Sequence, residues 1–214
     1  MANLHLVTAV AYADHARCRL EVVAPDPCPE QSPLVLIGGG WWRGQSAEQL
    51  RHLAIRLAEQ GQVCITLGQR SLEDAGGGDA LVTELAAGLR LGLEEVALLG
   101  GRLRGAQLLG SGSGSLLALA LAGRLADDPE LACRGVVCAG GAVTTTPWEA
   151  CPSSIAERLQ RFAPAERGNE LDPLQIPADR LPPVFLLHGD SDQEPPAAVA
   201  RQLYRRLLDA ESGR

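Results

Sequence analysis

The stretch from Gln107 to Ala120 constrains the fold of this chain more than any other segment. An apolar run, Leu108-Leu109, leads into a glycine-serine turn at 110–114, and a second apolar run begins at Leu116. Strands that are apolar throughout are buried on both faces, which is typical of parallel sheets covered by helices on both sides. The stretch therefore predicts a buried strand, a tight turn and a buried helix of an α/β fold.

The same alternation runs through most of the chain. An opening pair of strands is predicted at 4–13 and 18–24, and later apolar runs predict buried strands at 34–37, 63–67, 135–139 and 183–187. Segments with apolar residues at helical spacing follow several of these strands. Ser46 and Asp79 are predicted to cap two of the helices, and Pro196 to begin the last one. We expect a three-layer α/β sandwich with a mostly parallel sheet.

Composition excludes several classes of function. The length of 214 residues and the 46% of hydrophobic residues predict one globular domain, 1–214. The net charge of -7 disfavours a nucleic-acid partner and an anionic membrane surface. All 19 basic residues are arginine, which excludes Schiff-base chemistry, Ser-Lys dyads and Walker-type phosphate binding.

The six cysteines indicate neither a metal site nor a disulfide framework. None lies in a C-x-x-C pair, and their spacing matches no zinc motif, so we expect free thiols, no metal and no cofactor. The N-terminus does not read as a signal peptide, and no apolar run approaches the length of a membrane span. A reduced cytoplasmic setting fits this pattern. The cysteines are Cys18, Cys28, Cys64, Cys133, Cys138 and Cys151.

The glycine-serine turn has the layout of a nucleophile elbow, a strained strand-to-helix turn with the pattern small-x-nucleophile-x-small. Gly110 and Gly114 are the small flanks, and Gly112 stands at the nucleophile position. Glycine adopts a positive φ without strain, so we expect the turn to be kept while the attacking oxygen is absent. A register shifted by one residue would make Ser113 the nucleophile instead.

Three motifs in order resemble the α/β-hydrolase fold, and within it the small esterases and formamidases with a His-Gly-Gly-Gly-Trp oxyanion loop. Residues 33–44 (PLVLIGGGWWRG) resemble that loop, 108–119 the elbow and its helix, and 188–192 (HGDSD) the loop of the catalytic acid. The resemblance implies that Gly38, Gly39 and Gly40 present N–H groups to a ligand oxygen. It also implies that Trp41 or its neighbour faces the ligand, and that Asp192 is the acid.

The departures from this family are as informative as the matches. Ile37 stands where the loop histidine is expected, and no histidine follows His188. In the family the catalytic histidine comes after one more helix and strand, so we expect the last strand of the family's sheet to be missing. The strand at 183–187 would then have an open edge, which is a pairing hazard. We expect a partner protein, a second copy of the chain or the C-terminal segment to cover it.

Three functions remain open at this point. The first is an esterase-like protein that has lost Ser-His-Asp catalysis and acts as a binding or interaction protein, with a small acyl-type ligand as one candidate. The second is an active carboxylic-ester or amide hydrolase that uses Ser113 or a base from a partner chain. The third is nucleotide binding at 110–114, where a glycine-rich turn opens a helix. Asp192 could also cap the next helix or pair with an arginine without serving any site.

Overall fold

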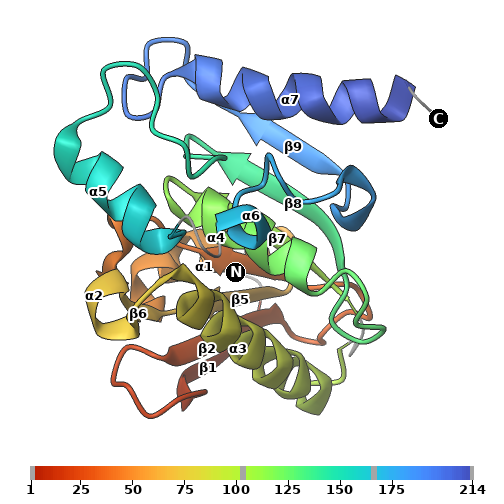
Figure 1. Cartoon of the computed structure of the whole chain (residues 1–214). Helices are drawn as coiled ribbons and strands as arrows, with labels where there is room; N and C mark the ends of the chain where they lie inside the picture. Colours follow the sequence, from red (N-terminus) through yellow and green to blue (C-terminus); the bar gives the residue numbers. More distant parts are fainter. Residues whose placement is uncertain (1–2, 102–104, 165–167, 213–214) are drawn as a thin grey trace.

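Seven strands form the main sheet of the computed structural model, which describes residues 3–101, 105–164 and 168–212. They are β1 (Leu4–Ala11), β2 (Arg19–Pro25), β3 (Leu34–Ile37), β5 (Cys64–Leu67), β7 (Ala106–Ser111), β8 (Cys133–Ala139) and β9 (Val184–Leu187). Their order across the sheet is β1-β2-β5-β3-β7-β8-β9 (Figure 1). The β1–β2 and β2–β5 pairs are antiparallel, and the other four pairs are parallel. The predicted mostly parallel sheet is confirmed.

Helices connect the parallel strands, and one more helix follows the last strand. They are α1 (Arg51–Ala58), α2 (Leu72–Ala75), α3 (Gly78–Leu98), α4 (Gly114–Arg124), α5 (Ser153–Phe162), α6 (Gly168–Leu171) and α7 (Ala197–Ser212), with short 3-10 turns η1 (Gly40–Trp42), η2 (Ala47–Leu50) and η3 (Ala178–Arg180). A second, two-stranded sheet pairs β4 (Arg43–Gln45) with β6 (Gln69–Ser71). Strands of three residues contain too little periodicity to be found in the sequence, and this small sheet was not predicted.

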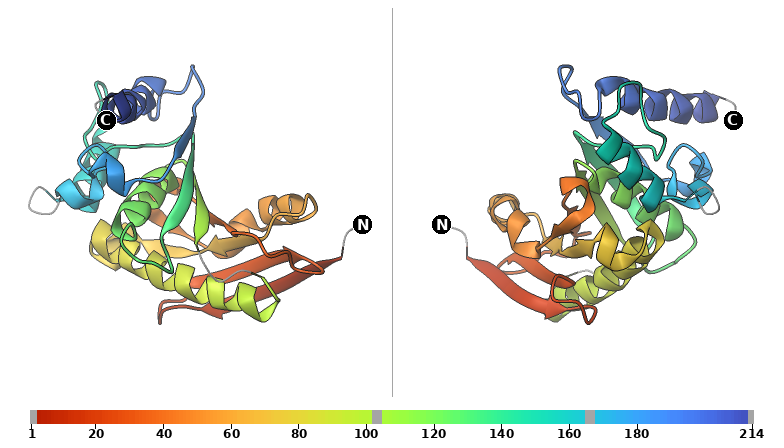
Figure 2. Two further views of the ribbon diagram at one scale, coloured as in Figure 1. Left: turned by 90° about the vertical axis from the view of Figure 1, so that its right-hand side faces the viewer. Right: turned by 60° about the vertical axis from the view of Figure 1, so that its left-hand side comes forward.

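The helices lie on both faces of the main sheet, as the two views of Figure 2 show. The larger core lies on the side of α3, α4 and α5, where residues 114–123 of α4 are buried on all sides. A smaller core lies under α1 and includes Val23, Leu36 and Ala54. None of the helices in the described ranges has the length and apolar character needed to cross a membrane. The predicted three-layer arrangement is therefore present.

Two predicted helix caps are wrong. Ser46 occupies the N-cap position of the 3-10 turn η2 rather than of α1, which begins at Arg51, and its side chain makes no cap bond. Asp79 lies inside the first turn of α3, which begins one residue earlier, at Gly78. The Asp79 carboxylate accepts instead from Arg124 on α4 at 2.5 Å. In both places contacts with neighbouring elements decide where the helix begins.

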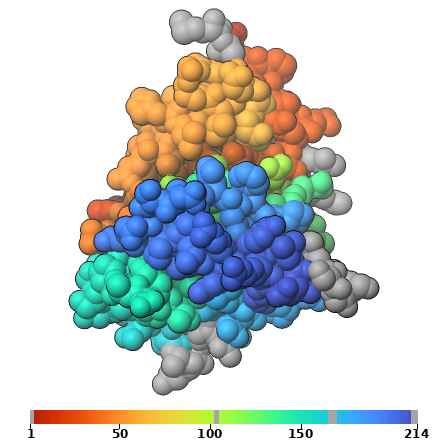
Figure 3. Space-filling view, turned by 90° about the horizontal axis from the view of Figure 1, so that it is seen from above, coloured from red at the N-terminus to blue at the C-terminus, as the bar shows by residue number. Residues whose placement is uncertain are grey.

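β9 lies at the edge of the sheet, with β8 on one side and no strand on the other among the described residues. Its alternate side chains Phe185 and Leu187 are 62% and 59% exposed. Val184 and Leu186 face the opposite way, toward α7, and pack against the larger core. In the space-filling view the blue C-terminal residues lie beside the teal segment around residue 150 (Figure 3). A partner protein, a second copy or the C-terminal segment is expected to cover the edge of β9. Of these, the C-terminal segment lies beside β9 but does not pair with it.

Candidate functional site

The turn between β7 and α4 is built by close backbone contacts that only glycine permits. A Cβ added at Gly110 would lie 2.4 Å from the oxygen of Gly114, and one added at Gly114 would lie 2.3 Å from the oxygen of Ile37. Gly112, at the apex, has a φ of +55° and donates its N–H to the Ala139 oxygen at 2.9 Å. A Cβ at Gly112 would meet only the Gly39 Cα, at 3.8 Å. The apex therefore has room for a side chain, but the residue there supplies none.

Ser113, the alternative nucleophile, is only 3% exposed. Its Oγ accepts the main-chain N–H of Trp41 at 2.8 Å, and its carbonyl oxygen accepts the indole N–H of Trp42 at 3.1 Å. Both oxygens of Ser113 thus face the segment that follows β3. This hydroxyl joins the two loops in the present geometry.

The glycines that follow β3 lie directly on the turn. A Cβ at Gly39 would lie 2.4 Å from the Ser111 oxygen and 2.9 Å from the Ser113 nitrogen. In the part of the chain that the structure describes, the N–H groups of Gly39 and Ser113 donate no hydrogen bond. Two free main-chain donors therefore lie close together at the N-terminus of α4, whose helix dipole favours negative charge. Such paired donors can bind a carbonyl or carboxylate oxygen.

An aromatic cluster adjoins the glycine segment. Trp41 and Trp42 both have left-handed backbone angles, with φ values of 52° and 55°. The Trp42 ring is fully buried and stacks on Phe162, with ring centroids 4.5 Å apart. Trp41 is partly exposed, and its ring centroid lies 6.1 Å from that of Trp148. One tryptophan thus packs in the core, while the other and Trp148 reach the surface beside the turn.

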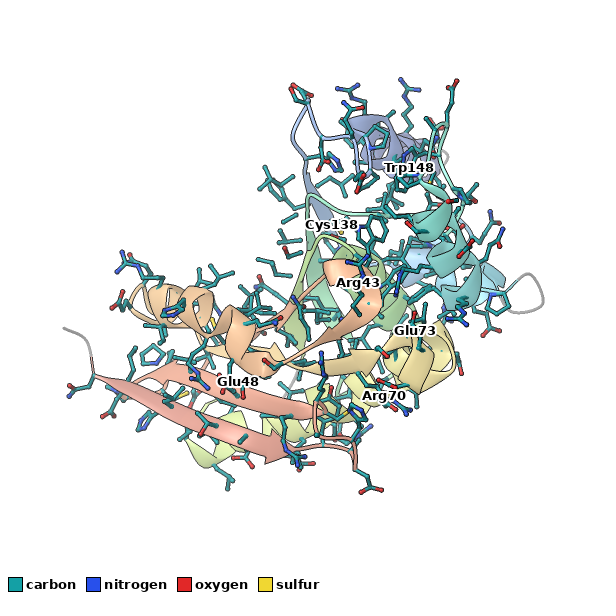
Figure 4. All side chains as sticks on the ribbon, turned by 90° about the vertical axis from the view of Figure 1, so that its left-hand side faces the viewer. Arg43, Glu48, Arg70, Glu73, Cys138 and Trp148 are labelled. Atoms are coloured by element: carbon teal, nitrogen blue, oxygen red, sulfur yellow. The ribbon has the colours of Figure 1, made fainter. Side chains whose placement is uncertain are left out.

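Helix α5 connects this cluster to α2. Arg158 donates to the main-chain oxygen of Trp41 at 3.1 Å and pairs with Glu73 of α2 at 3.1 Å. In Figure 4, Trp148 and Glu73 lie on either side of α5, which is drawn in teal. The sequence analysis did not single out Arg158. Only its tertiary contact with Trp41, 117 residues away, marks it as part of the site's surroundings.

Asp192, the predicted acid, lies next to the segment that follows β8, and that segment contacts the turn. Its Oδ2 is 4.0 Å from the position of a Cβ on Gly140, and a Cβ on the adjacent Gly141 would lie 1.8 Å from the Gly112 oxygen. The Asp192 Oδ1 accepts the N–H of Glu194 at 2.9 Å, and its Oδ2 lies 3.6 Å from Nε2 of His188. No arginine pairs with Asp192 among the described residues.

Three of the four histidines have partners away from the apex of the turn, and the fourth, His52, is exposed on α1. Nε2 of His188 lies 2.8 Å from the Pro195 oxygen, so the ring donates to that carbonyl, and its side chain is 7% exposed. His5 lies beside Asp26 at 3.2 Å and His15 beside Asp74 at 4.0 Å, both in the N-terminal segments. The described residues therefore show a carboxylate near the turn and paired N–H donors on it, but no side-chain oxygen at the apex.

The thiols near the turn are poor nucleophiles. Burial raises the pKa of Cys138, which lies on β8 next to the turn, to about 12, and burial also raises the pKa of Cys151. A thiol is nucleophilic only as thiolate, so both remain largely protonated at neutral pH. Within the described ranges, no group of three or more His, Cys, Asp or Glu residues is placed to hold a metal ion.

No protein-family model matches the sequence, and no curated protein sequence matches it. Solved structures do match. Esterase B from Lactobacillus rhamnosis superposes with a TM-score of 0.82 at 18% identity, over 97% of this chain and 72% of the esterase. A truncated carbohydrate esterase from gut microbiota matches with a TM-score of 0.82 at 19% identity, over 96% and 84%.

A carboxylesterase from Lactobacillus plantarum is also similar, with a TM-score of 0.76 at 11% identity, over 98% of this chain and 80% of that one. Together with the strand order, these likenesses establish the fold. The chain has an esterase-like α/β-hydrolase fold, as the sequence motifs predicted.

Proposed function

We propose that this chain is a binding protein on an esterase-like scaffold, which has lost Ser-His-Asp catalysis and binds a small acyl ligand at the turn between β7 and α4. The observation that carries the proposal is Gly112 at the apex of the turn, with a φ of +55°. Glycine has no oxygen or sulfur to attack a carbonyl, so covalent catalysis has no nucleophile at this position. The oxygens of Ser113, the adjacent residue, face the glycine segment instead.

The ligand class follows from what the turn offers. The free N–H groups of Gly39 and Ser113 suit one oxygen of an ester carbonyl or a carboxylate. The partly exposed rings of Trp41 and Trp148 offer an apolar surface for a short acyl chain. Within the described residues, no arginine forms an ion pair with Asp192. The negative charge of this carboxylate therefore disfavours ligands that carry two negative charges.

Ligand-observed NMR with butyrate and with p-nitrophenyl butyrate tests this proposal. We expect both to bind, and the ester to remain intact. Gly112→Leu would place a side chain where the ligand lies and abolish binding. Gly100→Leu is the matched control, because Gly100 also has a positive φ, +88°, and nothing lies within 4 Å of its Cβ position. Equal binding by both variants, or no binding by the wild type, contradicts the proposal.

The alternative is an active hydrolase that uses Ser113 or a base from a partner chain. It requires the Ser113 hydroxyl to leave the Trp41 N–H and reach the surface. A fluorophosphonate probe that labels any serine of the wild-type protein would favour this alternative. Absence of labelling, with p-nitrophenyl acetate turnover at background, favours the binding protein.

A further inference from the structure

The small β4–β6 sheet holds two glutamines against the first glycine of the loop. Gln45 and Gln69 are direct partners across this pair of strands. Nε2 of Gln69 donates to the Gly38 oxygen at 3.2 Å, and Oε1 of Gln45 lies 1.6 Å from the position that a Cβ on Gly38 would take. Both side-chain amides therefore lie against Gly38.

These glutamines are unfavourable for stability. Gln69 is 1% exposed, and the Oε1 atoms of Gln45 and Gln69 are buried without a hydrogen-bond partner in the described part of the chain. A buried polar atom without a partner is destabilising, and an apolar side chain of the same size would avoid this loss. Among the described residues, the bond to the Gly38 oxygen is the one hydrogen bond that the Gln69 side-chain amide makes. Any functional role of the Gln69 amide therefore depends on this hydrogen bond.

The geometry of the peptide group links this hydrogen bond to the direction of the Gly39 N–H. The C=O of Gly38 and the N–H of Gly39 belong to one planar trans peptide and point in opposite directions. A donor that holds the Gly38 oxygen on one side aims the Gly39 N–H to the other. Both flanking residues are glycines, whose backbone is the least restrained, so the loop's own side chains cannot fix this peptide.

We propose that Gln69 is the positioning residue of the glycine loop, which aims the Gly39 N–H at the ligand oxygen by holding the Gly38 carbonyl. This inference rests on the proposed function, because Gly39 is one of its two donors. Gln69 itself does not touch the ligand. Its role is to orient one peptide.

The test compares Gln69→Met with Gln45→Met. Both substitutions keep the side-chain length and remove a buried unpartnered oxygen, but only the first removes the donor to Gly38. The readout without ligand is the amide resonance of Gly39, and the readout with ligand is the affinity for butyrate. In Gln69→Met we expect a shifted Gly39 amide resonance and about tenfold weaker butyrate binding, with a modest loss of thermal stability because the Gly38 oxygen loses its donor.

In Gln45→Met we expect the Gly39 amide resonance to be unchanged and the affinity for butyrate to stay within about twofold of the wild type. An unmoved Gly39 amide in folded Gln69→Met overturns the inference, whether or not butyrate binds. If the Gly39 amide responds but the wild type does not bind butyrate, the positioning role stands and the proposed function fails.

A second variant covers the case in which Gln69→Met does not fold. In Gln69→Glu the introduced carboxyl can donate to Gly38 only while protonated. We expect the Gly39 amide to be wild-type-like at low pH and shifted at high pH. A Gly39 amide in this variant that is insensitive to pH between 4 and about 8 also overturns the inference.

Discussion

The main-chain N–H of Trp41 donates to the Ser113 Oγ at 2.8 Å and joins two segments that are 72 residues apart in the sequence. The same serine accepts the Trp42 indole through its carbonyl oxygen. Ser113 thereby connects the glycine segment after β3 to the N-terminus of α4. The hydroxyl that a shifted register would make a nucleophile is, in this structure, a link between two loops.

Ser113→Ala removes this contact and tests its contribution to stability. Loss of the hydroxyl leaves the part-buried Trp41 N–H without its partner, and we expect the free energy of unfolding to fall by about 1–2 kcal/mol. Turnover of p-nitrophenyl butyrate should be at background in wild type and variant alike. Urea unfolding monitored by tryptophan fluorescence gives the first quantity, and Ser191→Ala, at an exposed position, is the control. Wild-type turnover that Ser113→Ala removes would make Ser113 the nucleophile.

The three loop glycines should differ in their tolerance of alanine. At Gly39 the new Cβ would meet the Ser111 backbone oxygen at 2.4 Å, so the backbone must shift, and we expect a loss of about 3 kcal/mol or more. At Gly38 it meets the flexible end of Gln45, which can move aside. At Gly40 nothing lies within 4 Å, but its φ of +73° costs about 1–2 kcal/mol. Thermal denaturation of the three variants checks this order, and a Gly39→Ala protein as stable as Gly40→Ala would contradict it.

The buried ion pair under α1 should matter more than its surface counterpart. Glu21 is 1% exposed and accepts Nε of Arg51 at 2.9 Å, whereas Arg56 and Glu59 pair at the surface. Arg51→Met leaves the buried Glu21 carboxylate without its cation, and we expect a clearly larger loss of stability than from breaking the surface pair. Arg56→Met, the matched control, should change the free energy of unfolding by less than about 1 kcal/mol. Equal effects in chemical denaturation would contradict this difference.

Thiol alkylation should separate the buried cysteines from the accessible ones. Burial raises the pKa values of Cys64 and Cys138 to about 12. At pH 8 only about one in 10,000 of these thiols is ionised, and the fraction rises tenfold with each pH unit up to the pKa. We expect iodoacetamide to modify Cys28 and Cys151, which are partly exposed, well before these two. Peptide mass spectrometry measures the order, and alkylation of Cys138 at the same rate with and without urea would contradict it.

Hydrogen exchange along β9 should alternate. The Pro183 oxygen accepts from Val136 and the Leu187 oxygen from Gly140, so the main-chain groups of residues 183, 185 and 187 face β8. Those of Val184 and Leu186 face the open edge. In a dilute solution of the chain alone we expect the Val184 and Leu186 amides to exchange fast and those of Phe185 and Leu187 slowly.

The same measurement tests for a partner on this edge. We propose, as the sequence predicts, that a second copy or a partner protein can pair with β9 through residues 183–187. Protection of Leu186 that increases with protein concentration, together with a dimer in sedimentation, would demonstrate pairing with a second copy. Fast exchange at Leu186 and a monomer at every concentration would contradict pairing between copies.

Much of the fold could be predicted because it follows from local patterns. The strand at 34–37 was predicted with the bounds that the structure has, and the helix after Pro196 begins at Ala197. Apolar runs bounded by turn residues can be recognised directly in the sequence. The full length of α3 was harder to predict, because Gly88 and Gly92 weaken a helix. Their Cβ positions would lie 3.1 Å from the Tyr12 ring and 2.9 Å from Ile65, so close packing against the sheet favours glycine there.

The sequence by itself determined that this chain is an α/β protein, and it predicts that the motifs follow the order of an esterase and that Gly112 stands at the nucleophile position. Only the tertiary structure decided that Ser113 faces the Trp41 N–H, that Gln69 reaches the Gly38 carbonyl, and that Asp192 lies near the turn. The physical reason is the separation in sequence between the residues that interact. Strand and helix patterns depend on neighbours a few residues away, whereas these contacts join segments 31 or more residues apart and exist only once the sheet has brought them together.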